Sequence, residues 1–104
     1  MGQYVAPIRD MQFVLHEFLN VTEEFKSLPA YQEIDADIIN QVLEEGAKFT
    51  QEVLFPLNHS GDREGCHYDA ATKSVTTPKG FKDAYKKYVD GGWAALACDP
   101  EYGG

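Results

Sequence analysis

The apolar residues of the chain recur mostly with the spacing of an α-helix, and the first such stretch follows Asp10. Five of them fall at positions i, i+3, i+4, i+7 and i+8, which places them on one helix face: Met11, Val14, Leu15, Phe18 and Leu19. Asp10 is the expected N-cap, because its carboxylate can accept a hydrogen bond from a free backbone N–H. Residues 1–9 contain Pro7 and show no periodicity, so they are expected to form an extended lead-in.

A second, shorter helix is expected after Asn20, where the first apolar face is interrupted. The tetrapeptide Thr22-Glu23-Glu24-Phe25 is typical of a helix start, with the threonine in the capping position. Pro29 is expected to end this helix, since a proline disfavours the helical conformation in the residue before it.

The longest helical pattern begins at Asp35 and reaches Phe55. Asp35 or Asp37 is the expected N-cap, and a broad apolar face follows: Ile38, Ile39, Val42, Leu43, Phe49, Val53 and Leu54. Gly46 lies within this face, where a glycine costs about 1 kcal/mol relative to alanine. A close helix–helix crossing would explain it. Pro56 is expected to kink or end the helix around Phe55, because it lacks a backbone N–H.

Residues 58–77 are polar and rich in turn-forming residues, so we expect a loop or a short hairpin there. In the hairpin, His67-Tyr68 would pair with Ser74–Thr76. The segment also holds five side chains of kinds that bind metals: His59, Asp62, Glu64, Cys66 and His67. Their spacing fits neither a zinc pattern nor a calcium loop, so a surface loop is the favoured interpretation.

Thr77 and Pro78 are expected to open the last long helix, with threonine as N-cap and proline at the first helical position. Its apolar face is formed by Phe81, Ala84, Tyr85, Tyr88 and Val89. Gly91 is expected to close it in the left-handed conformation, and residues 93–96 can form one further turn. The whole pattern predicts an all-α fold, a small bundle of three to four amphipathic helices with the 58–77 loop or hairpin attached.

The composition supports a folded chain and argues against two classes of partner. Hydrophobic residues make up 43% of the 104 residues, enough for a packed core in one domain or part of one. The net charge of −8 disfavours nucleic acid and anionic membrane surfaces, which attract clustered Lys and Arg. The pattern predicts neither a membrane span nor a signal peptide. Cys66 and Cys98 form no CxxC pair, so we expect a cytoplasmic protein with free thiols.

No group of residues in the sequence predicts a catalytic centre. The three histidines lie far apart, and adjacent acids such as Glu44-Glu45 point in different directions on a helix. No Ser or Cys stands in a nucleophile motif, and Gly103-Gly104 is not the glycine-rich loop that cradles phosphates. We therefore assign no catalytic, cofactor-binding or metal-binding residue.

Three stretches of the chain carry a resemblance to a known family. They are residues 4–15 (YVAPIRDMQFVL), residues 53–58 with 60–66 (VLFPLN, SGDREGC), and residues 91–93 with 99–104 (GGW, DPEYGG). In their order and spacing they resemble the N-terminal helical region of the flavin-dependent acyl-CoA dehydrogenases. More narrowly, they are similar to the branch that includes 3-methylmercaptopropionyl-CoA dehydrogenase-like proteins.

The resemblance implies an enzyme that oxidises acyl-CoA thioesters to 2-enoyl-CoA. A carboxylate removes the α-proton and a β-hydride passes to FAD. It also implies three domains, with the base and the main flavin contacts in the two that follow the helical one. Residues 1–104 are then expected to be the N-terminal helical domain, a scaffold that packs on the other domains. We expect it to bind no FAD and to be inactive alone, in a homo-oligomeric parent enzyme.

The last residues agree with this view, because Asp99-Pro100 and Gly103-Gly104 are turn signals that normally lead into another element. We therefore expect residues 1–104 to be a fragment of a longer chain. The alternative is an independent helical module that binds a protein partner.

Overall fold

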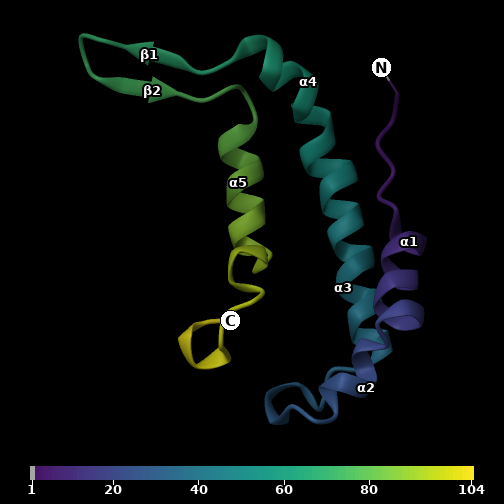
Figure 1. The fold of residues 1–104 in the computed structure, drawn as a ribbon. Helices are drawn as coiled ribbons and strands as arrows, with labels where there is room; N and C mark the ends of the chain where they lie inside the picture. The colour runs from purple at the N-terminus through teal and green to yellow at the C-terminus, as the bar shows by residue number, and fades with distance from the viewer. Residues whose placement is uncertain (1) are drawn as a thin grey trace. The chain divides into compact units, whose positions relative to one another are not determined.

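The computed structural model describes residues 2–104, and its secondary structure is mostly helical (Figure 1). Met1, the first residue of the expected lead-in, lies outside this range. The α-helices are α1 Ile8–Gln12, α2 Val21–Phe25, α3 Ala36–Phe49, α4 Phe55–Glu64 and α5 Phe81–Asp90. The prediction of an all-α fold is confirmed. The chain divides into two compact units, unit 1 (Met1–Glu52) and unit 2 (Val53–Gly104).

The first helix of unit 1 begins earlier than the sequence pattern predicted. Pro7 is the residue before the helix, and α1 starts at Ile8, so the lead-in is shorter than residues 1–9. Asp10 lies inside the first turn and does not cap it, which corrects the expected N-cap. Its position is still favourable, because a negative charge in the first turn complements the helix dipole.

Residues Phe13–Phe18 continue α1 as a π-helical segment, a wider form in which hydrogen bonds span five residues. Asn20 then ends it with a left-handed φ of 50°, and is the residue that precedes α2. Asparagine is one of the few residues that adopts this conformation readily. Thr22 therefore lies inside α2 and is not its cap, and α2 ends before Pro29, which opens a 3-10 turn.

Helix α3 begins where the sequence placed it. The Asp35 side chain accepts a hydrogen bond from the backbone N–H of Ile38 at 2.9 Å, which confirms Asp35 as the N-cap. Within unit 1, α1 packs beside α3 (Figure 1). His16 and Asn40 join the two helical segments by a hydrogen bond of 2.7 Å between His16 Nε2 and Asn40 Oδ1.

Pro56 was expected to kink or end the helix, and the structure shows that it does not end the helical backbone. Residues Thr50–Leu54 form a second π-helical segment, and α4 follows directly with Pro56 in its first turn. A proline is tolerated there because the first N–H groups of a helix have no partner within it. The polar segment from residue 58 is consequently helical as far as Glu64, and the loop begins only after it.

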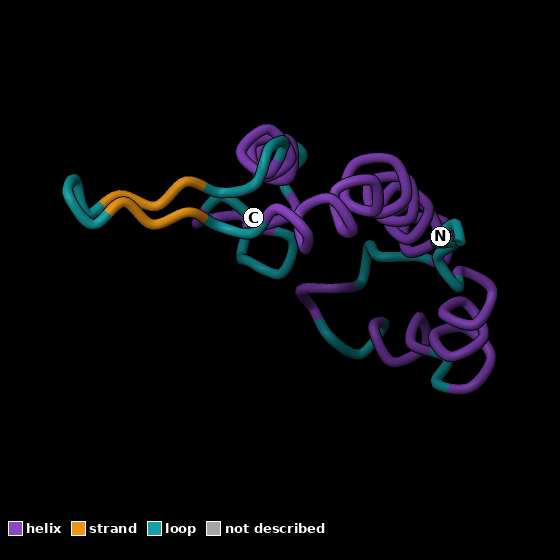
Figure 2. The backbone as a smooth tube through the Cα atoms, turned by 90° about the horizontal axis from the view of Figure 1, so that it is seen from above, coloured by secondary structure: helices purple, strands orange, loops and turns teal. Residues whose placement is uncertain are grey.

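The hairpin predicted within residues 58–77 is present in unit 2. Strands β1 (His67–Asp69) and β2 (Ser74–Thr76) are antiparallel, with Tyr68 opposite Val75. Figures 1 and 2 show the hairpin extending away from the ends of α4 and α5. All six strand residues are exposed, so the hairpin is an extension of the unit and not part of a core.

The last helix begins later than Thr77-Pro78 predicted. Pro78 accepts a hydrogen bond from the Phe81 N–H at 3.1 Å, and Gly80 takes a left-handed φ of 91°. A left-handed residue cannot belong to a right-handed helix, so α5 starts after Gly80. At its other end Gly92, and not Gly91, carries the positive φ. The predicted further turn is a 3-10 turn at Trp93–Ala95.

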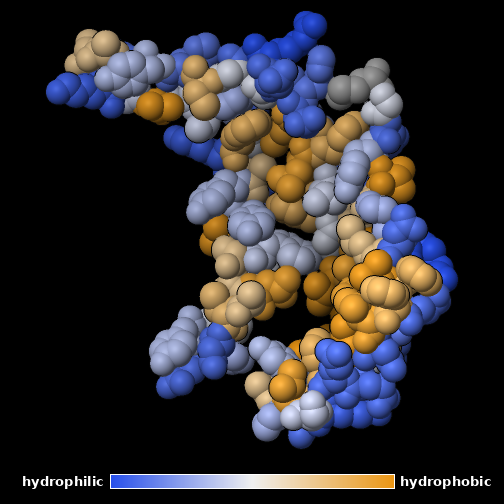
Figure 3. Space-filling view, viewed as in Figure 1, coloured by the Kyte–Doolittle hydropathy of each residue, from blue (hydrophilic) through white to orange (hydrophobic). Residues whose placement is uncertain are grey.

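The buried residues of both units are few and small. Among residues 2–104 they are Ala6, Gly61, Pro78 and Ala84. Large apolar side chains remain accessible on each unit, for example Phe18 at 73% and Tyr85 at 68% of full exposure. Figure 3 shows this hydrophobic surface in orange over the helices of both units. Amphipathic helices of a folded domain normally bury such side chains against another element.

No helix within residues 2–104 is long and apolar enough to cross a membrane.

Candidate functional site

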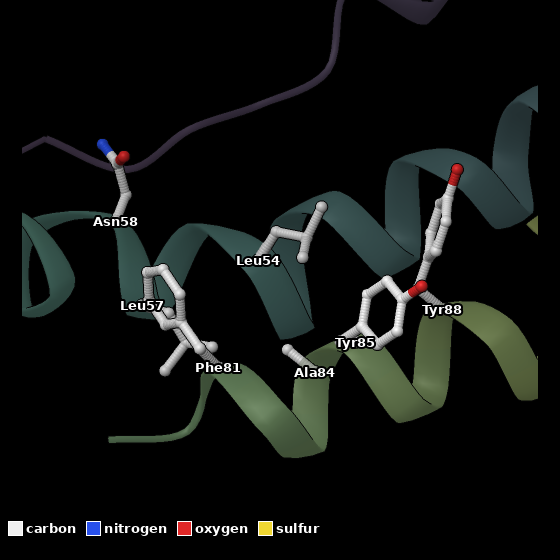
Figure 4. Close-up of a pocket in the computed structure, with 7 residues that line it drawn as sticks. All are labelled: Leu54, Leu57, Asn58, Phe81, Ala84, Tyr85 and Tyr88. Carbon is white, nitrogen blue, oxygen red and sulfur yellow. The ribbon is translucent and has the colours of Figure 1, made fainter. Parts of the chain in front are cut away.

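An apolar groove of unit 2 lies between α4, which leads into the hairpin, and α5, which leads away from it (Figure 1). We call it the α4/α5 groove; its lining residues are Leu54, Leu57, Asn58, Phe81, Ala84, Tyr85 and Tyr88. It encloses about 280 Å³. Figure 4 shows Leu57 and Phe81 together at one end and the two tyrosines at the other.

Two glycines allow α4 and α5 to approach at the closed end of the groove. A Cβ atom added to Gly61 would lie 2.5 Å from the Phe81 ring, and one added to Gly80 would lie 2.7 Å from Leu57 Cδ2. Carbon atoms in contact are normally separated by about 3.5–4.0 Å. Phe81 and Leu57 therefore occupy the space that side chains at these two positions would fill.

The carboxylate of Glu64 ties the end of α4 to the start of α5. Its Oε2 accepts a hydrogen bond from the backbone N–H of Lys79 at 2.5 Å. Gly65 ends α4 with a positive φ of 69°, which lets the chain turn into the hairpin. The polar groups at this end are thus used to position the two helices.

Aromatic rings form the open end of the groove. The rings of Tyr85 and Tyr88 have centroids 6.4 Å apart and an angle of 29° between their planes, which is a stacked arrangement. Leu54 and Ala84 supply aliphatic surface beside them. The groove therefore offers mostly carbon surface, suited to burying another apolar surface.

The five possible metal ligands noted in the sequence are distributed over three kinds of segment. His59, Asp62 and Glu64 lie on α4, Cys66 follows the helix, and His67 begins β1. Glu64 already accepts the Lys79 N–H, and Cys66 is an exposed free thiol. No three His, Cys, Asp or Glu side chains within residues 2–104 are placed to hold a metal ion.

The residues of the groove do not fit FAD, the cofactor that the resemblance implies. A dinucleotide needs backbone N–H groups of a glycine-rich turn, or cationic side chains, for its pyrophosphate. The groove is lined by aliphatic and aromatic side chains, with the Asn58 amide and two tyrosine hydroxyls as its polar groups. We therefore place no flavin contact on these residues.

Sequence reasoning found one wall of the groove and missed the other. The apolar face of α5 was evident from its spacing, whereas Gly61 was assigned to the polar loop 58–77 and Leu57 lay beyond the expected kink or end of the preceding helix. A signal was present, because Leu54, Leu57 and Gly61 continue the helical spacing of i, i+3 and i+7 past Pro56. The polar residues among them obscured it.

Comparison with known proteins gives matches along almost the whole chain, although no family profile matches it. A 3-methylmercaptopropionyl-CoA dehydrogenase of Ruegeria pomeroyi is 38% identical over 101 residues, which are 97% of this chain and 17% of that protein. A butyryl-CoA dehydrogenase of Syntrophomonas wolfei is 32% identical over 91 residues, 86% of this chain and 15% of that protein. Over nearly its whole length, the chain is thus related to one part of the acyl-CoA dehydrogenases.

A third relative, a broad-specificity linear acyl-CoA dehydrogenase of Mycobacterium tuberculosis, is 27% identical over 104 residues, 100% of this chain and 17% of that enzyme. The chain thus spans about one sixth of the length of the relatives it matches. This agrees with the resemblance to an N-terminal acyl-CoA dehydrogenase region that the three sequence stretches indicated.

Proposed function

We propose that this chain is the N-terminal helical scaffold of an FAD-dependent acyl-CoA dehydrogenase, which oxidises acyl-CoA thioesters to 2-enoyl-CoA. In this proposal the chain supplies helices that pack on the rest of the enzyme and help to exclude water from its active site. It supplies neither the base nor the main flavin contacts, and it is inactive alone. FAD and the acyl-CoA bind to the full-length enzyme.

The observation that carries this proposal is the 38% identity over 97% of the chain, combined with a match to only 17% of the relative. The exposed apolar helices support it, since amphipathic helices in a folded domain bury their apolar face against another element. The mostly apolar groove also supports a packing role, because catalysis by proton abstraction needs a positioned and partly desolvated carboxylate.

A chimaeric enzyme tests the proposal. The 101 matching residues of the Ruegeria pomeroyi dehydrogenase are replaced by this chain, and flavin content and acyl-CoA-dependent dye reduction are measured. We expect both in the chimaera, and neither in the dehydrogenase lacking those residues or in the 104-residue chain alone. Flavin and dye reduction in the chain alone would overturn the scaffold role, and an inactive chimaera without flavin would count against the assignment.

We also propose that the parent enzyme is a cytoplasmic homo-oligomer. The two exposed free thiols, Cys66 and Cys98, support a reducing compartment. The accessible apolar surface of both units supports packing between subunits as well as between domains. Light scattering of the active chimaera, compared with the mass of one subunit, tests the oligomeric state.

A further inference from the structure

The open face of α5 combines an apolar row with a basic border. Phe81, Tyr85 and Val89 follow one another at i, i+4 and i+8, and they are 39%, 68% and 46% exposed. Residues with this spacing form a ridge along one side of a helix. Lys82 follows Phe81 and Lys86 follows Tyr85 in the sequence, so both lysines lie on the same side of the ridge.

Lys82 borders the groove beside Phe81 and Tyr85, whereas Glu64 and Lys79 line a separate hollow beside Leu57. Lys82 lines a second hollow of about 340 Å³ with Thr77, Phe81 and Tyr85, next to the α4/α5 groove. Of the described residues that line the groove and this second hollow, Lys82 alone is charged. Lys86, by contrast, is neutralised by Asp90, with Lys86 Nζ 2.7 Å from Asp90 Oδ2. Lys82 forms no ion pair with any of residues 2–104.

We propose that the α4/α5 groove is the docking site for a third amphipathic helix whose apolar stripe is bordered by Asp or Glu residues. The proposal rests on the proposed function, because that helix belongs to the remaining part of the longer enzyme. A groove between two antiparallel helices accepts a helix laid along it, with its apolar side chains between theirs. The acidic border of the partner then faces Lys82 and fixes the register.

Charge also decides against a second copy of this chain as the occupant. A two-fold pairing of the same surface would bring the Lys82 side chains of both copies to one interface. Two lysines brought together at an interface would repel each other and disfavour a second copy. An acidic border on another helix would instead attract Lys82. The occupant is therefore a helix of different sequence.

Two synthetic helical peptides test this inference on the full 104-residue chain. They share one leucine stripe of about three heptads, and differ only in having Glu or Lys at the bordering positions. Affinities are measured by titration calorimetry at physiological salt, where the Debye length is about 8 Å and distant charges are screened. We expect the Glu peptide to bind about tenfold more tightly, with backbone amide shifts at Phe81 and Tyr85.

The Lys82→Glu variant should reverse the preference between the two peptides. The matched control is Lys48→Glu, an equal change in net charge on α3 of unit 1, which should leave the preference unchanged. Equal affinities for both peptides, absence of binding, or a preference that ignores Lys82→Glu would each overturn the inference. Dimerisation of the chain that depends on Lys82 would identify a second copy as the occupant, and would overturn it as well.

These results separate the inference from the proposed function. The peptide titrations report only on the groove of this chain, whereas the chimaera reports on flavin and turnover. An active chimaera with no peptide selectivity would remove the acidic helix and leave the scaffold role intact. Selective peptide binding with an inactive chimaera would remove the scaffold role and leave an acidic helix as the ligand of the groove.

Discussion

Each unit of the chain is stabilised internally by a different kind of contact. In unit 1, side-chain hydrogen bonds join distant segments: Gln51 Oε1 accepts the Ala6 N–H at 2.7 Å, and His16 pairs with Asn40. In unit 2, glycines let backbone and apolar side chains approach closely, at Gly61 and Gly80. The charge differs as well, because unit 1 has three basic and ten acidic residues (net −7) and unit 2 has six and seven (net −1).

This difference predicts how each unit responds to change. A hydrogen bond contributes about 0.5–1.5 kcal/mol net, so unit 1 should lose stability in small, separable steps. A close glycine contact tolerates no side chain, so unit 2 should lose stability steeply at single positions. Local opening free energies from native-state hydrogen exchange, read separately for amides of α3 and α5, measure both responses.

The largest effect is expected for Gly80→Ala in unit 2. The substitution places a Cβ at a positive φ of 91° and 2.7 Å from Leu57 Cδ2. Left-handed strain of about 1–2 kcal/mol and overpacking of about 1–3 kcal/mol should together lower the opening free energy of α5 by about 2–5 kcal/mol. Amide exchange in α3 should be unchanged.

Gly92→Ala is the matched control, because Gly92 also has a positive φ, of 81°, but no atom within 4 Å of an added Cβ. It should show the strain alone, about 1–2 kcal/mol. Equal losses in the two variants would mean that the Leu57 contact carries no energy. Loss of protection in α3 as well would show that the two units open together.

Gly61→Ala is the next test, and it is informative whether the substitution lowers or raises the stability of α5. Alanine in a helix interior is ordinarily more stable than glycine by about 0.5–1 kcal/mol. At Gly61 the added Cβ would lie 2.5 Å from the Phe81 ring, so we expect destabilisation of α5 by about 1–2 kcal/mol. Exchange of α5 amides measures it.

A double-mutant cycle with Phe81→Leu separates the contact from the helix propensity. In the Phe81→Leu background the smaller side chain leaves room, so Gly61→Ala should become neutral or stabilising. A gain in stability for Gly61→Ala in the wild-type background would show that the helices are not in close contact there.

In unit 1 the largest single loss is expected for Gln51→Ala. The Ala6 N–H lies in a partly buried position and would lose its acceptor, at a cost of about 1–2 kcal/mol. Hydrogen exchange should show faster exchange at Ala6 and α3, with α5 unaffected. Gln41→Ala, at an exposed position of α3, is the control and should change little. Equal effects at the two glutamines would refute a specific bond.

Asp35→Ala should destabilise α3 by about 1 kcal/mol, because the Ile38 N–H loses its capping oxygen. Asp35→Asn keeps an acceptor at the same place and should retain most of the stability. The measurement is the opening free energy of the first amides of α3. A loss as large for asparagine as for alanine would assign the effect to charge and not to capping.

The helices could be predicted from the sequence wherever a regular apolar period coincides with a strong local signal. Asp35 is such a case, since one acidic residue stands directly before the longest period and caps it. The hairpin is another, because two short segments flank a cluster of turn-forming residues. The predicted pairing of His67-Tyr68 with Ser74–Thr76 agrees with the register found, in which Tyr68 lies opposite Val75. The family resemblance, confirmed by the relatives, came from the order of three short stretches.

The remaining errors arise where two local preferences compete. Pro56 and Pro78 were both interpreted as helix boundaries. Pro56 lies within the first turn of α4, whereas Pro78 lies before α5 and is separated from it by the turn at Gly80. The deciding residue at the second is Gly80, whose left-handed φ of 91° excludes it from α5. The α4/α5 groove was missed for the same reason, because half of it depends on helical backbone beyond Pro56.

The smallest effect is expected at the Arg9–Glu17 ion pair, and it tests whether charge contributes to the stability of the acidic unit. Arg9 Nη2 lies 3.0 Å from Glu17 Oε1, and the two side chains are 69% and 54% exposed, so solvent screens the pair. Glu17→Gln should change the opening free energy of unit 1 by less than about 0.5 kcal/mol, because exposed pairs contribute little. Hydrogen exchange at low and at high salt measures it. An effect larger than that of Gln51→Ala, abolished by salt, would show that ion pairs and not side-chain hydrogen bonds hold unit 1 together.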